Sequence, residues 1–335
     1  MTVTRVGVLM GGTSAERTVS LQTGAAVADA LARDEREVVP LDLAPETDIA
    51  RQIIDAQLDV AFLALHGRLG EDGCVQGMLE ILGIPYTGSS VLSSALAMDK
   101  LKSKELFRLH NVPTPPYYEI RAEEGIADVE EAHGSFGYPA IVKPRREGSS
   151  VGVTRANSVA DLAKGVRMAL EHDDSVLVER FITGKEIAVG ILDGRVLGAV
   201  EIEPKSGIYD FEAKYTPGMT EYHLPARLPP VRYRGVLNLA EQAARAVDAT
   251  GAVRVDLLVT EGQNEYVLEV NTLPGMTPTS LLPKIAAAAG YAFHDLCEAI
   301  LASARLHVAK ARPQVQTSVP DATKSEEALP LRVAV

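Results

Sequence analysis

Two carboxylates and an amide, those of Asp256, Glu269 and Asn271, could together hold a divalent cation. All three offer oxygen ligands, which favour Mg²⁺ or Mn²⁺ over Zn²⁺. If Asp256 faces Glu269 across a pair of strands, their Cβ atoms are about 5 Å apart, and the two charges repel each other unless a cation lies between them. The competing interpretation is an exposed polar face whose charges are incidental.

A hairpin would bring these side chains together. Residues 253–259 and 265–271 both have the Val- and Leu-rich composition of strands. Between them, Gly262 and Gln263 predict a two-residue type II′ turn, which prefers Gly at its first position. This turn pairs the two acidic residues and, because side chains alternate along a strand, puts four polar residues on one face: Arg254, Asp256, Glu269 and Asn271.

Two further segments could bind anions. Residues 271–280 lead into a predicted helix whose free N–H groups suit a carboxylate or a phosphate, although capping alone would explain Ser280 at its start. Lys143 ends a predicted strand before the loop 147–152, whose backbone N–H groups can approach phosphate oxygens. Neither G-x-G-x-x-G after the first strand nor G-x-x-x-x-G-K-[ST] occurs, so an ATP site would be of another kind.

The same loop offers a rival chemistry. Residues 148–152 match the nucleophile motif G-x-S-x-G of serine hydrolases, with Ser150 as the nucleophile. Asp161 and His172 follow it and could complete a triad. The motif needs a strand before it and a helix after it, whereas residues 153–156 predict a second strand, which argues against this interpretation.

The helices and strands predicted around these residues fall into three groups. In residues 1–98, strands alternate with helical patterns, which is typical of a parallel sheet with helices on its faces. Binding sites lie beyond the carboxyl ends of such strands, so the loops 11–17 and 66–73 are candidate site loops. The strands of this group are predicted at 6–10, 38–43 and 60–65.

A predicted helix at 99–110 leads to two further groups. The proline-rich stretch 112–116 marks a domain boundary. The second group is small and mixed, and the third begins near Gly184 with a hairpin that turns at Asp193-Gly194. The long polar loop 203–225 of the third group is typical of a lid. A long helix, the hairpin described above and two terminal helices complete the third group.

Composition limits the partners and the compartment. The 335 residues leave room for two or three domains at roughly 150 residues each. The net charge of −12 argues against nucleic acid or an anionic membrane as the main partner. Cys74 and Cys297 form no disulfide framework, and we expect two buried thiols in a reducing cytosol. The start lacks a signal-peptide pattern and no run of about 18 apolar residues occurs, so we expect a cytoplasmic protein.

These motifs together resemble those of D-alanine–D-alanine ligases, a family of the ATP-grasp superfamily, from about residue 5 to residue 306. Ile208 departs from the family, because many relatives have an aromatic residue there. The pair Lys214-Tyr215 resembles the dipeptide-forming branch of the family rather than the ligases that make a D-lactate depsipeptide. The matching blocks are 11–17, 64–73, 86–90, 98–100, 142–144, 146–152, 212–215, 253–256 and 269–277.

The resemblance implies a mixed α/β protein with the ATP-grasp fold, in which two α+β units clasp ATP. The implied division is an N-terminal parallel α/β substrate domain at 1–110, a central ATP-grasp subdomain at 111–183, a C-terminal ATP-grasp subdomain with the metal site at 184–312, and a disordered tail at 313–335.

The resemblance also assigns residues to ATP and to two Mg²⁺ or Mn²⁺ ions. The ions would be held by Asp256, Glu269 and Asn271, in agreement with the hairpin. The residues implied for ATP are Lys100 and Lys143 at the phosphates, Glu179, Phe181 and Ile182 at the adenine, Glu186 at the ribose, and Lys214.

A second set of residues is implied for two D-alanines. Glu16 would bind the first ammonium group, and Ser149 and Tyr215 would link Glu16 to the lid. Arg254 and the backbone N–H of Gly275 would stabilise an oxyanion. The remaining residues are Ser280 and Leu281 at the second carboxylate, and His66 within the site.

The reaction implied is the ATP-dependent joining of two D-alanines through an acyl phosphate, for peptidoglycan precursor synthesis. Relatives are commonly dimers, so a homodimer is expected by analogy. Three alternatives remain open: an ATP-grasp ligase for a different acid and amine, a serine hydrolase that uses Ser150, and a nucleotide-binding module without catalysis.

Overall fold

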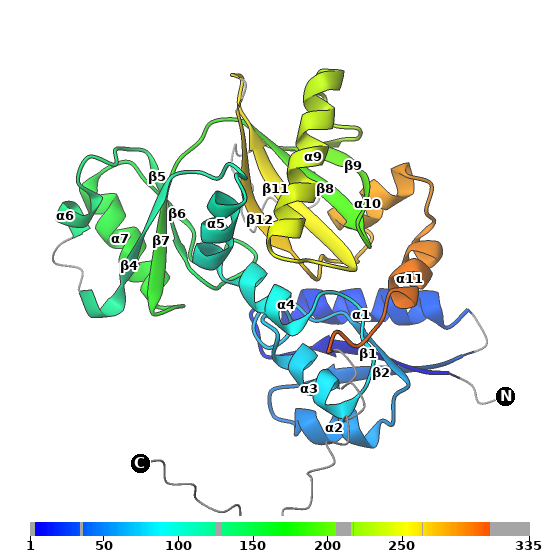
Figure 1. The fold of residues 1–335 in the computed structure, drawn as a ribbon. Coiled ribbons are helices and arrows are strands. Elements are labelled where there is room, and N and C mark those ends of the chain that lie inside the picture. The colour runs from blue at the N-terminus through cyan, green and yellow to red at the C-terminus, as the bar shows by residue number, and fades with distance from the viewer. Residues whose placement is uncertain are drawn as a thin grey trace, which may run out of the picture.

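The structure, a computed structural model, describes residues 4–33, 36–124, 129–205, 216, 218–262 and 264–308. Three separate β-sheets organise this part of the chain (Figure 1). The sheets follow one another in the sequence, so each is built from one continuous stretch. The architecture is the mixed α/β arrangement that the sequence predicts.

The N-terminal sheet is parallel, with strand order β2-β1-β3. The middle strand β1 is apolar and buried because helices cover both of its faces, so that Val8 packs into one core and Leu9 into another. The elements are β1 (Arg5–Gly11), α1 (Arg17–Leu31), β2 (Glu37–Leu43), α2 (Ile49–Asp55), β3 (Val60–Leu63) and α3 (Cys74–Leu82).

Two helices, α4 (Val91–Met98) and α5 (Lys100–Leu109), lead out of this unit. The sequence predicts a helix at 99–110 and misses α4. Asp99 separates the two helices and caps the second, because its carboxylate accepts a hydrogen bond from the Lys102 N–H at 3.0 Å. Helix α5 lies between the second and third sheets (Figure 1).

The second sheet is antiparallel, with strand order β4-β7-β5-β6. Val142 of β5 packs against α7, whereas Ile141 and Lys143 on the other face of the strand border a cavity. The elements are β4 (Tyr117–Arg121), a 3₁₀ turn (Ala122–Glu124), α6 (Val129–His133), β5 (Ala140–Pro144), β6 (Thr154–Ala156), α7 (Val159–Leu170) and β7 (Ser175–Arg180).

The third sheet is also antiparallel, with strand order β10-β9-β8-β11-β12. Helix α9 covers one face and α10 the other (Figure 1), so Val189 and Ala188 of β8 point into different cores. Strand β10 lies inside the stretch 203–225 that the sequence assigns to a loop. The elements are β8 (Lys185–Leu192), β9 (Arg195–Pro204), β10 (Thr220–His223), α9 (Pro230–Ala246), β11 (Ala252–Val259), β12 (Glu265–Asn271), α10 (Leu281–Ala288) and α11 (Phe293–Ala302).

The last helix, α11, returns to the first unit. Leu296, Cys297 and Ile300 share a core with Val27 and Leu31 of α1, and the two helices lie side by side (Figure 1). The sequence places both terminal helices with the third unit, so this return is a difference. Both thiols are free, as the composition predicts, and Cys297 is buried, but the expectation of a second buried thiol is wrong, because Cys74 is exposed at the start of α3.

Among the described residues, no single helix has the length and apolar character needed to cross a membrane. One bent pair, α10 with α11 at an angle of 102°, meets those two criteria by length and composition alone.

Candidate active site

Two adjoining cavities lie where the three units meet. The larger has a volume of about 500 Å³ and lies between the second and third sheets. The smaller, of about 110 Å³, lies between the carboxyl ends of the N-terminal strands and the start of α10. Gly148, Ser149 and Glu269 line both cavities, so they form a shared wall.

The larger cavity gathers the described residues that the resemblance implies for ATP. Phe181 is held from one side by Arg155, whose guanidinium lies 4.2 Å from the centre of the ring. Lys100 donates a hydrogen bond to the carbonyl of Glu147, and burial lowers the pKa of Lys100 although Glu269 attracts its charge. The expected residues that line this cavity are Lys100, Lys143, Glu179, Phe181, Ile182 and Glu186.

Glu179 carries the counter-charge for two lysines. Its carboxylate lies 2.8 Å from Lys104 Nζ and 2.9 Å from Lys143 Nζ, and it is almost fully buried. Burial alone would raise the pKa of Glu179, but attraction to Lys104 and Lys143 outweighs it and the pKa lies below the ordinary value. The group is therefore ionised at neutral pH.

The hairpin β11–β12 pairs the two acidic residues as the sequence predicts. Asp256 lies opposite Glu269, and Arg254 lies opposite Asn271. The predicted two-residue turn is wrong, because it would pair Val259 with Tyr266, whereas Val259 pairs with Glu265. The Thr260 N–H donates to the Asn264 carbonyl at 3.1 Å, which excludes a two-residue turn at Gly262 and Gln263.

A β-bulge restores the register. Leu257 pairs with Val267 and Asp256 with Glu269, so Leu268 is the extra residue. Val267 and Val270 point into the core, whereas Leu268 and Glu269 both border the larger cavity. The bulge thus directs two consecutive side chains to the site.

The hairpin residues fit a divalent cation. Asp256 accepts hydrogen bonds from Arg254 Nε and Nη2, each at 2.8 Å, and from Asn271 Nδ2 at 3.2 Å. Arg254 thus compensates the charge of Asp256, and Glu269 attracts the ammonium groups of Lys100 and Lys104. Two opposed carboxylates and an amide are an oxygen donor set for which Mg²⁺ is well suited, and a cation here would compete with Arg254 for Asp256.

The smaller cavity contains the described residues implied for the two D-alanines. Ser149 donates a hydrogen bond to the carboxylate of Glu16, which joins the loop after β5 to the loop after β1. Gly148 permits this approach, because a Cβ there would lie 2.5 Å from Glu16 Oε2. The expected residues that line this cavity are Glu16, His66, Ser149, Arg254, Glu269, Asn271, Gly275, Ser280 and Leu281.

Burial holds two titratable groups of this cavity in their neutral forms. The pKa of His66 is lowered by burial, although Glu16 attracts its charged form, and its Nε2 lies 3.3 Å from the Thr23 hydroxyl. Burial and repulsion from Glu16 raise the pKa of Glu71 to about 8. At neutral pH the Glu71 carboxyl is largely protonated, and one of its oxygens accepts a hydrogen bond from the Gly67 N–H at 2.6 Å.

The start of α10 also lines the smaller cavity. Ser280 occupies the N-cap position as predicted, but its hydroxyl makes no capping bond to the helix. The hydroxyl instead accepts a hydrogen bond from the Thr277 N–H at 3.1 Å. A Cβ at Gly275 would lie 2.8 Å from Ser280 Oγ, so only glycine fits there without a shift.

Some expected residues lie outside the described part of the chain, and some relevant ones were not predicted. Lys214, Tyr215 and Ile208 belong to the first group, as does the tail 313–335. Sequence reasoning missed Lys104, Glu71 and Glu201. Glu71 lies in the candidate loop 66–73 and Glu201 interrupts an apolar strand, so both carried a signal.

Glu201 is a buried carboxylate at the edge of the larger cavity. It pairs with Arg227 at 2.6 Å and with Lys185 at 3.0 Å. Burial alone would raise its pKa, but hydrogen bonds from Arg227 and Lys185 lower it to about 2.

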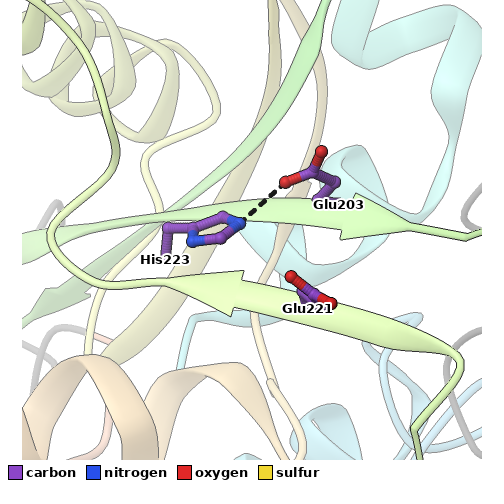
Figure 2. Close-up of side chains that lie close together, drawn as sticks. All are labelled: Glu203, Glu221 and His223. Carbon is purple, nitrogen blue, oxygen red and sulfur yellow. Dashed lines mark hydrogen bonds and ion pairs between the residues drawn. The ribbon is translucent and has the colours of Figure 1, made fainter.

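A second cluster of possible metal ligands lies on the neighbouring ladder. Glu203 of β9 faces Glu221 of β10, and His223 Nε2 lies 2.8 Å from Glu203 (Figure 2). Arg227 approaches the same carboxylate at 2.6 Å, and both partners lower the pKa of Glu203. This cluster is accounted for by ion pairing, and it gives no separate reason to assign a metal.

The loop around Ser150 has the wrong context for a serine hydrolase. Strand β5 precedes the loop, and strand β6, not a helix, follows it. The nucleophile motif requires a helix at that position. The structure therefore contradicts the hydrolase alternative.

A nucleotide-sized cavity lies between two antiparallel sheets, and lysines and paired carboxylates form part of its wall. A small polar cavity adjoins it. This arrangement is that of an ATP-grasp ligase. Residues 106–302 match the family model described as D-ala D-ala ligase C-terminus, and residues 45–89 match D-ala D-ala ligase N-terminus. The chain belongs to the D-alanine–D-alanine ligase family.

Individual relatives agree with this assignment. A D-alanine–D-alanine ligase of Geotalea uraniireducens is 51% identical over 308 residues, which cover 91% of this chain and 97% of the relative. A crystal structure of a D-alanine–D-alanine ligase from Bacillus anthracis is similar with a TM-score of 0.79 and 39% identity, covering 90% of this chain and 97% of that one. A Bacillus anthracis structure in complex with ATP has a TM-score of 0.78 and 37% identity over the same shares.

Proposed function

We propose that this chain joins two D-alanines into D-alanyl-D-alanine with ATP, for peptidoglycan precursor synthesis. The observation that carries the proposal is the wall shared by the two cavities, which contains Gly148, Ser149 and Glu269. A nucleotide in the larger cavity and an amino acid in the smaller one meet at this wall. A γ-phosphate can therefore reach a carboxylate there.

In the first step, a carboxylate oxygen of one D-alanine attacks the γ-phosphorus. The bond between that phosphorus and the β-phosphate oxygen breaks, which gives D-alanyl phosphate and ADP. Phosphoryl transfer depends on alignment and on charge compensation, and Lys100 and Lys143 supply positive charge in the wall of the larger cavity. Glu16, held by Ser149, binds the ammonium group of this first D-alanine.

In the second step, the unprotonated amine of another D-alanine attacks the carbonyl carbon of D-alanyl phosphate. The tetrahedral intermediate loses phosphate, and the attacking nitrogen gives up one proton to water or to the departing phosphate, so that a neutral peptide bond remains. Arg254 and the backbone N–H of Gly275 stabilise the oxyanion, while Ser280 and Leu281 bind the second carboxylate. His66, neutral in the same cavity, is suited to hydrogen bonding rather than to charge compensation.

Asp256, Glu269 and Asn271 would hold two Mg²⁺ or Mn²⁺ ions. Such ions, when bound, neutralise the charge that develops on the transferring phosphoryl group. The support for this assignment is the oxygen donor set and the direct pairing of Asp256 with Glu269. Glu179, Phe181, Ile182, Glu186 and Lys214 are proposed to bind the rest of the nucleotide.

Residues 203–220 are proposed to act as a lid. Tyr215 would bond Ser149 and so extend the link between Ser149 and Glu16 across the site. The lid would exclude water, because an acyl phosphate is otherwise hydrolysed.

The wider organisation is proposed on the family analogy. The domains are 1–110, 111–183 and 184–312, with α11 lying against the first of them. The enzyme is proposed to be a cytoplasmic homodimer that binds neither nucleic acid nor a membrane. The mass of the protein in solution, measured by light scattering, tests the dimer.

The substrate pair is tested by counting ADP and dipeptide together. The purified chain is offered D-alanine, L-alanine, D-serine and D-lactate, alone and in pairs, in Mg²⁺ and in EDTA. We expect one ADP per D-alanyl-D-alanine, with little product from the other acids and none in EDTA. Efficient ADP release with a different pair would instead favour a ligase for that acid and amine, and absence of ADP release with every pair would contradict the enzyme assignment.

A further inference from the structure

Lys104 is a fully buried lysine to which the mechanism above gives no role. It lies on α5, and its ammonium group has three neighbours: Glu179 at 2.8 Å, the Thr114 hydroxyl at 2.6 Å and the ring centre of Tyr117 at 5.7 Å. Burying a charge without partners would cost several kcal/mol, so this set of partners is what allows a lysine here. Burial lowers the pKa of Lys104 to about 8, while Glu179 favours its charged form.

The partners of Lys104 connect it to the nucleotide cavity. Glu179 of β7 lies between Lys104 of α5 and Lys143 of β5, with contacts of 2.8 and 2.9 Å. Two ammonium groups thus share one carboxylate, and the group of three has a net positive charge. Of the two lysines that contact Glu179, Lys143 lines the cavity and Lys104 does not, so the excess charge is available to phosphates there. If Lys104 were neutral, Lys143 and Glu179 would form a neutral pair.

A second branch leads from Lys104 to the metal hairpin. The Thr114 hydroxyl that accepts from Lys104 donates to the Val267 carbonyl at 2.9 Å. The Val267 N–H also donates to the Pro113 carbonyl, at 2.8 Å. Val267 directly precedes the bulge residue Leu268, after which Glu269 enters the cavity. Lys104 therefore contacts Glu179, the partner of the phosphate-binding Lys143, and also Thr114, which is bonded to the strand that carries Glu269.

We propose that Lys104 is a positioning residue for ATP. Lys104 holds Glu179, so that the charge of Lys143 remains available to the nucleotide phosphates. Through Thr114, Lys104 also connects this group to the strand that carries Glu269. The inference rests on the proposed use of ATP by this chain. It adds a residue that touches neither the nucleotide nor the amino acids.

The first test compares nucleotide binding by calorimetry. The probes are the non-hydrolysable ATP analogue AMP-PNP and adenosine, each with Mg²⁺. Lys104→Met should weaken AMP-PNP binding about tenfold, the loss expected for one compensating charge. Adenosine binding should stay within about twofold, because Glu179 keeps its contact with Lys143 at 2.9 Å. Lys102→Met is the matched control, because Lys102 lies on the same helix and pairs with Glu105 at 2.8 Å, but in solvent. It should leave both affinities unchanged.

The second test is rescue. Glu179→Gln removes the carboxylate that would otherwise neutralise Lys143, so adding Lys104→Met to Glu179→Gln should cost much less AMP-PNP affinity than Lys104→Met costs alone. Thr114→Val gives an independent variant should Lys104→Met fail to fold, and we expect a smaller loss of AMP-PNP affinity with adenosine binding unchanged.

The outcomes separate this inference from the function. If wild-type protein binds AMP-PNP and Lys104→Met binds it equally well, or loses adenosine and AMP-PNP affinity alike, the positioning role is wrong. Equal costs of Lys104→Met with and without Glu179 would also overturn it. If the wild type itself binds no AMP-PNP, the proposed use of ATP fails first.

Discussion

At the scale of single residues, the site is organised by the burial of charge. In the smaller cavity, burial keeps His66 neutral and Glu71 largely protonated at neutral pH. In the larger cavity, Glu179 stays ionised because two lysines contact it. Both effects follow from the cost of an uncompensated charge away from water. Side chains that look alike in the sequence therefore carry different charges in the folded protein.

Glu269 should be essential for turnover but not for folding. Glu269→Gln removes one carboxylate of the proposed metal set, so dipeptide synthesis in Mg²⁺ should fall to background. In EDTA the same change should leave the protein folded with little change in stability, because the relief of repulsion from Asp256, which lies directly opposite, is offset by the lost attraction to the buried ammonium group of Lys100. Dipeptide yield and urea unfolding check the two halves. A fully active variant would rule out the metal assignment.

Glu201 should give the protein a stability that is lost in acid. The pKa of Glu201 is about 2 in the folded state, against an ordinary value of 4.5. The folded carboxylate is thus favoured at pH values above 4.5, and this contribution is lost as the pH falls from 4.5 towards 2. Since Arg227 and Lys185 are partly exposed, we expect a contribution of about 1–3 kcal/mol.

The test is urea unfolding of wild type and Glu201→Gln at several pH values. The variant should be less stable at pH 7, and its stability should fall less steeply than that of the wild type as the pH drops below 4.5. Parallel pH profiles for the two proteins would show that Glu201 is not the group responsible.

At the scale of elements, the hairpin shows what a sequence can and cannot reveal. The pairing of Asp256 with Glu269 was predicted, but from a turn that the structure replaces with a different loop and a bulge at Leu268. Apolar alternation gives the strands, whereas a bulge depends on how β12 packs against its neighbours. Helix α4 was also missed. It ends at Met98, directly before Asp99 and α5, and the sequence was interpreted as one helix that begins at Asp99.

Two serines at helix starts should behave differently. Ser158 caps α7 by accepting a hydrogen bond from the Asp161 N–H at 3.2 Å, whereas the Ser280 hydroxyl makes no capping bond to α10. Ser158→Ala should cost about 0.5–2 kcal/mol of stability and leave catalysis unchanged. Ser280→Ala should cost less stability and raise the KM for D-alanine, because Ser280 borders the smaller cavity. Unfolding curves and initial rates distinguish the two, and the reverse pattern would contradict this assignment of roles.

At the scale of the whole molecule, the site exists only where three units meet. Local periodicity predicts the parallel sheet and most strands of the other two sheets, and it indicates the loops 11–17 and 66–73 as parts of a site, but it misses β4 of the second sheet and β10 of the third. The return of α11 to α1 and the contact of Lys104 with Glu179 could not be predicted, because both join segments that are far apart in the sequence. The motif residues were identified through a resemblance to a family, and the buried residues behind them were not.

The tail should be dispensable. Residues 313–335 are rich in polar residues, carry no recognisable motif and lie beyond the segment matched to the family. Removing them should change neither the melting temperature nor the rate of dipeptide synthesis appreciably. Calorimetry and initial rates of the truncated protein check this. A large loss of either would mean that the tail packs on the folded part or on a second copy.

One step decides the proposed function, namely the activation of a D-alanine carboxylate by ATP as an acyl phosphate. It is tested most directly by giving the enzyme D-alanine with both carboxylate oxygens as ¹⁸O and analysing the released phosphate by mass spectrometry. Since the attacking oxygen stays on the phosphate when the amine displaces it, each phosphate should carry one ¹⁸O, with ADP and dipeptide formed in equal amounts. Phosphate without label, or dipeptide formed with AMP in place of ADP, would rule out the acyl-phosphate route.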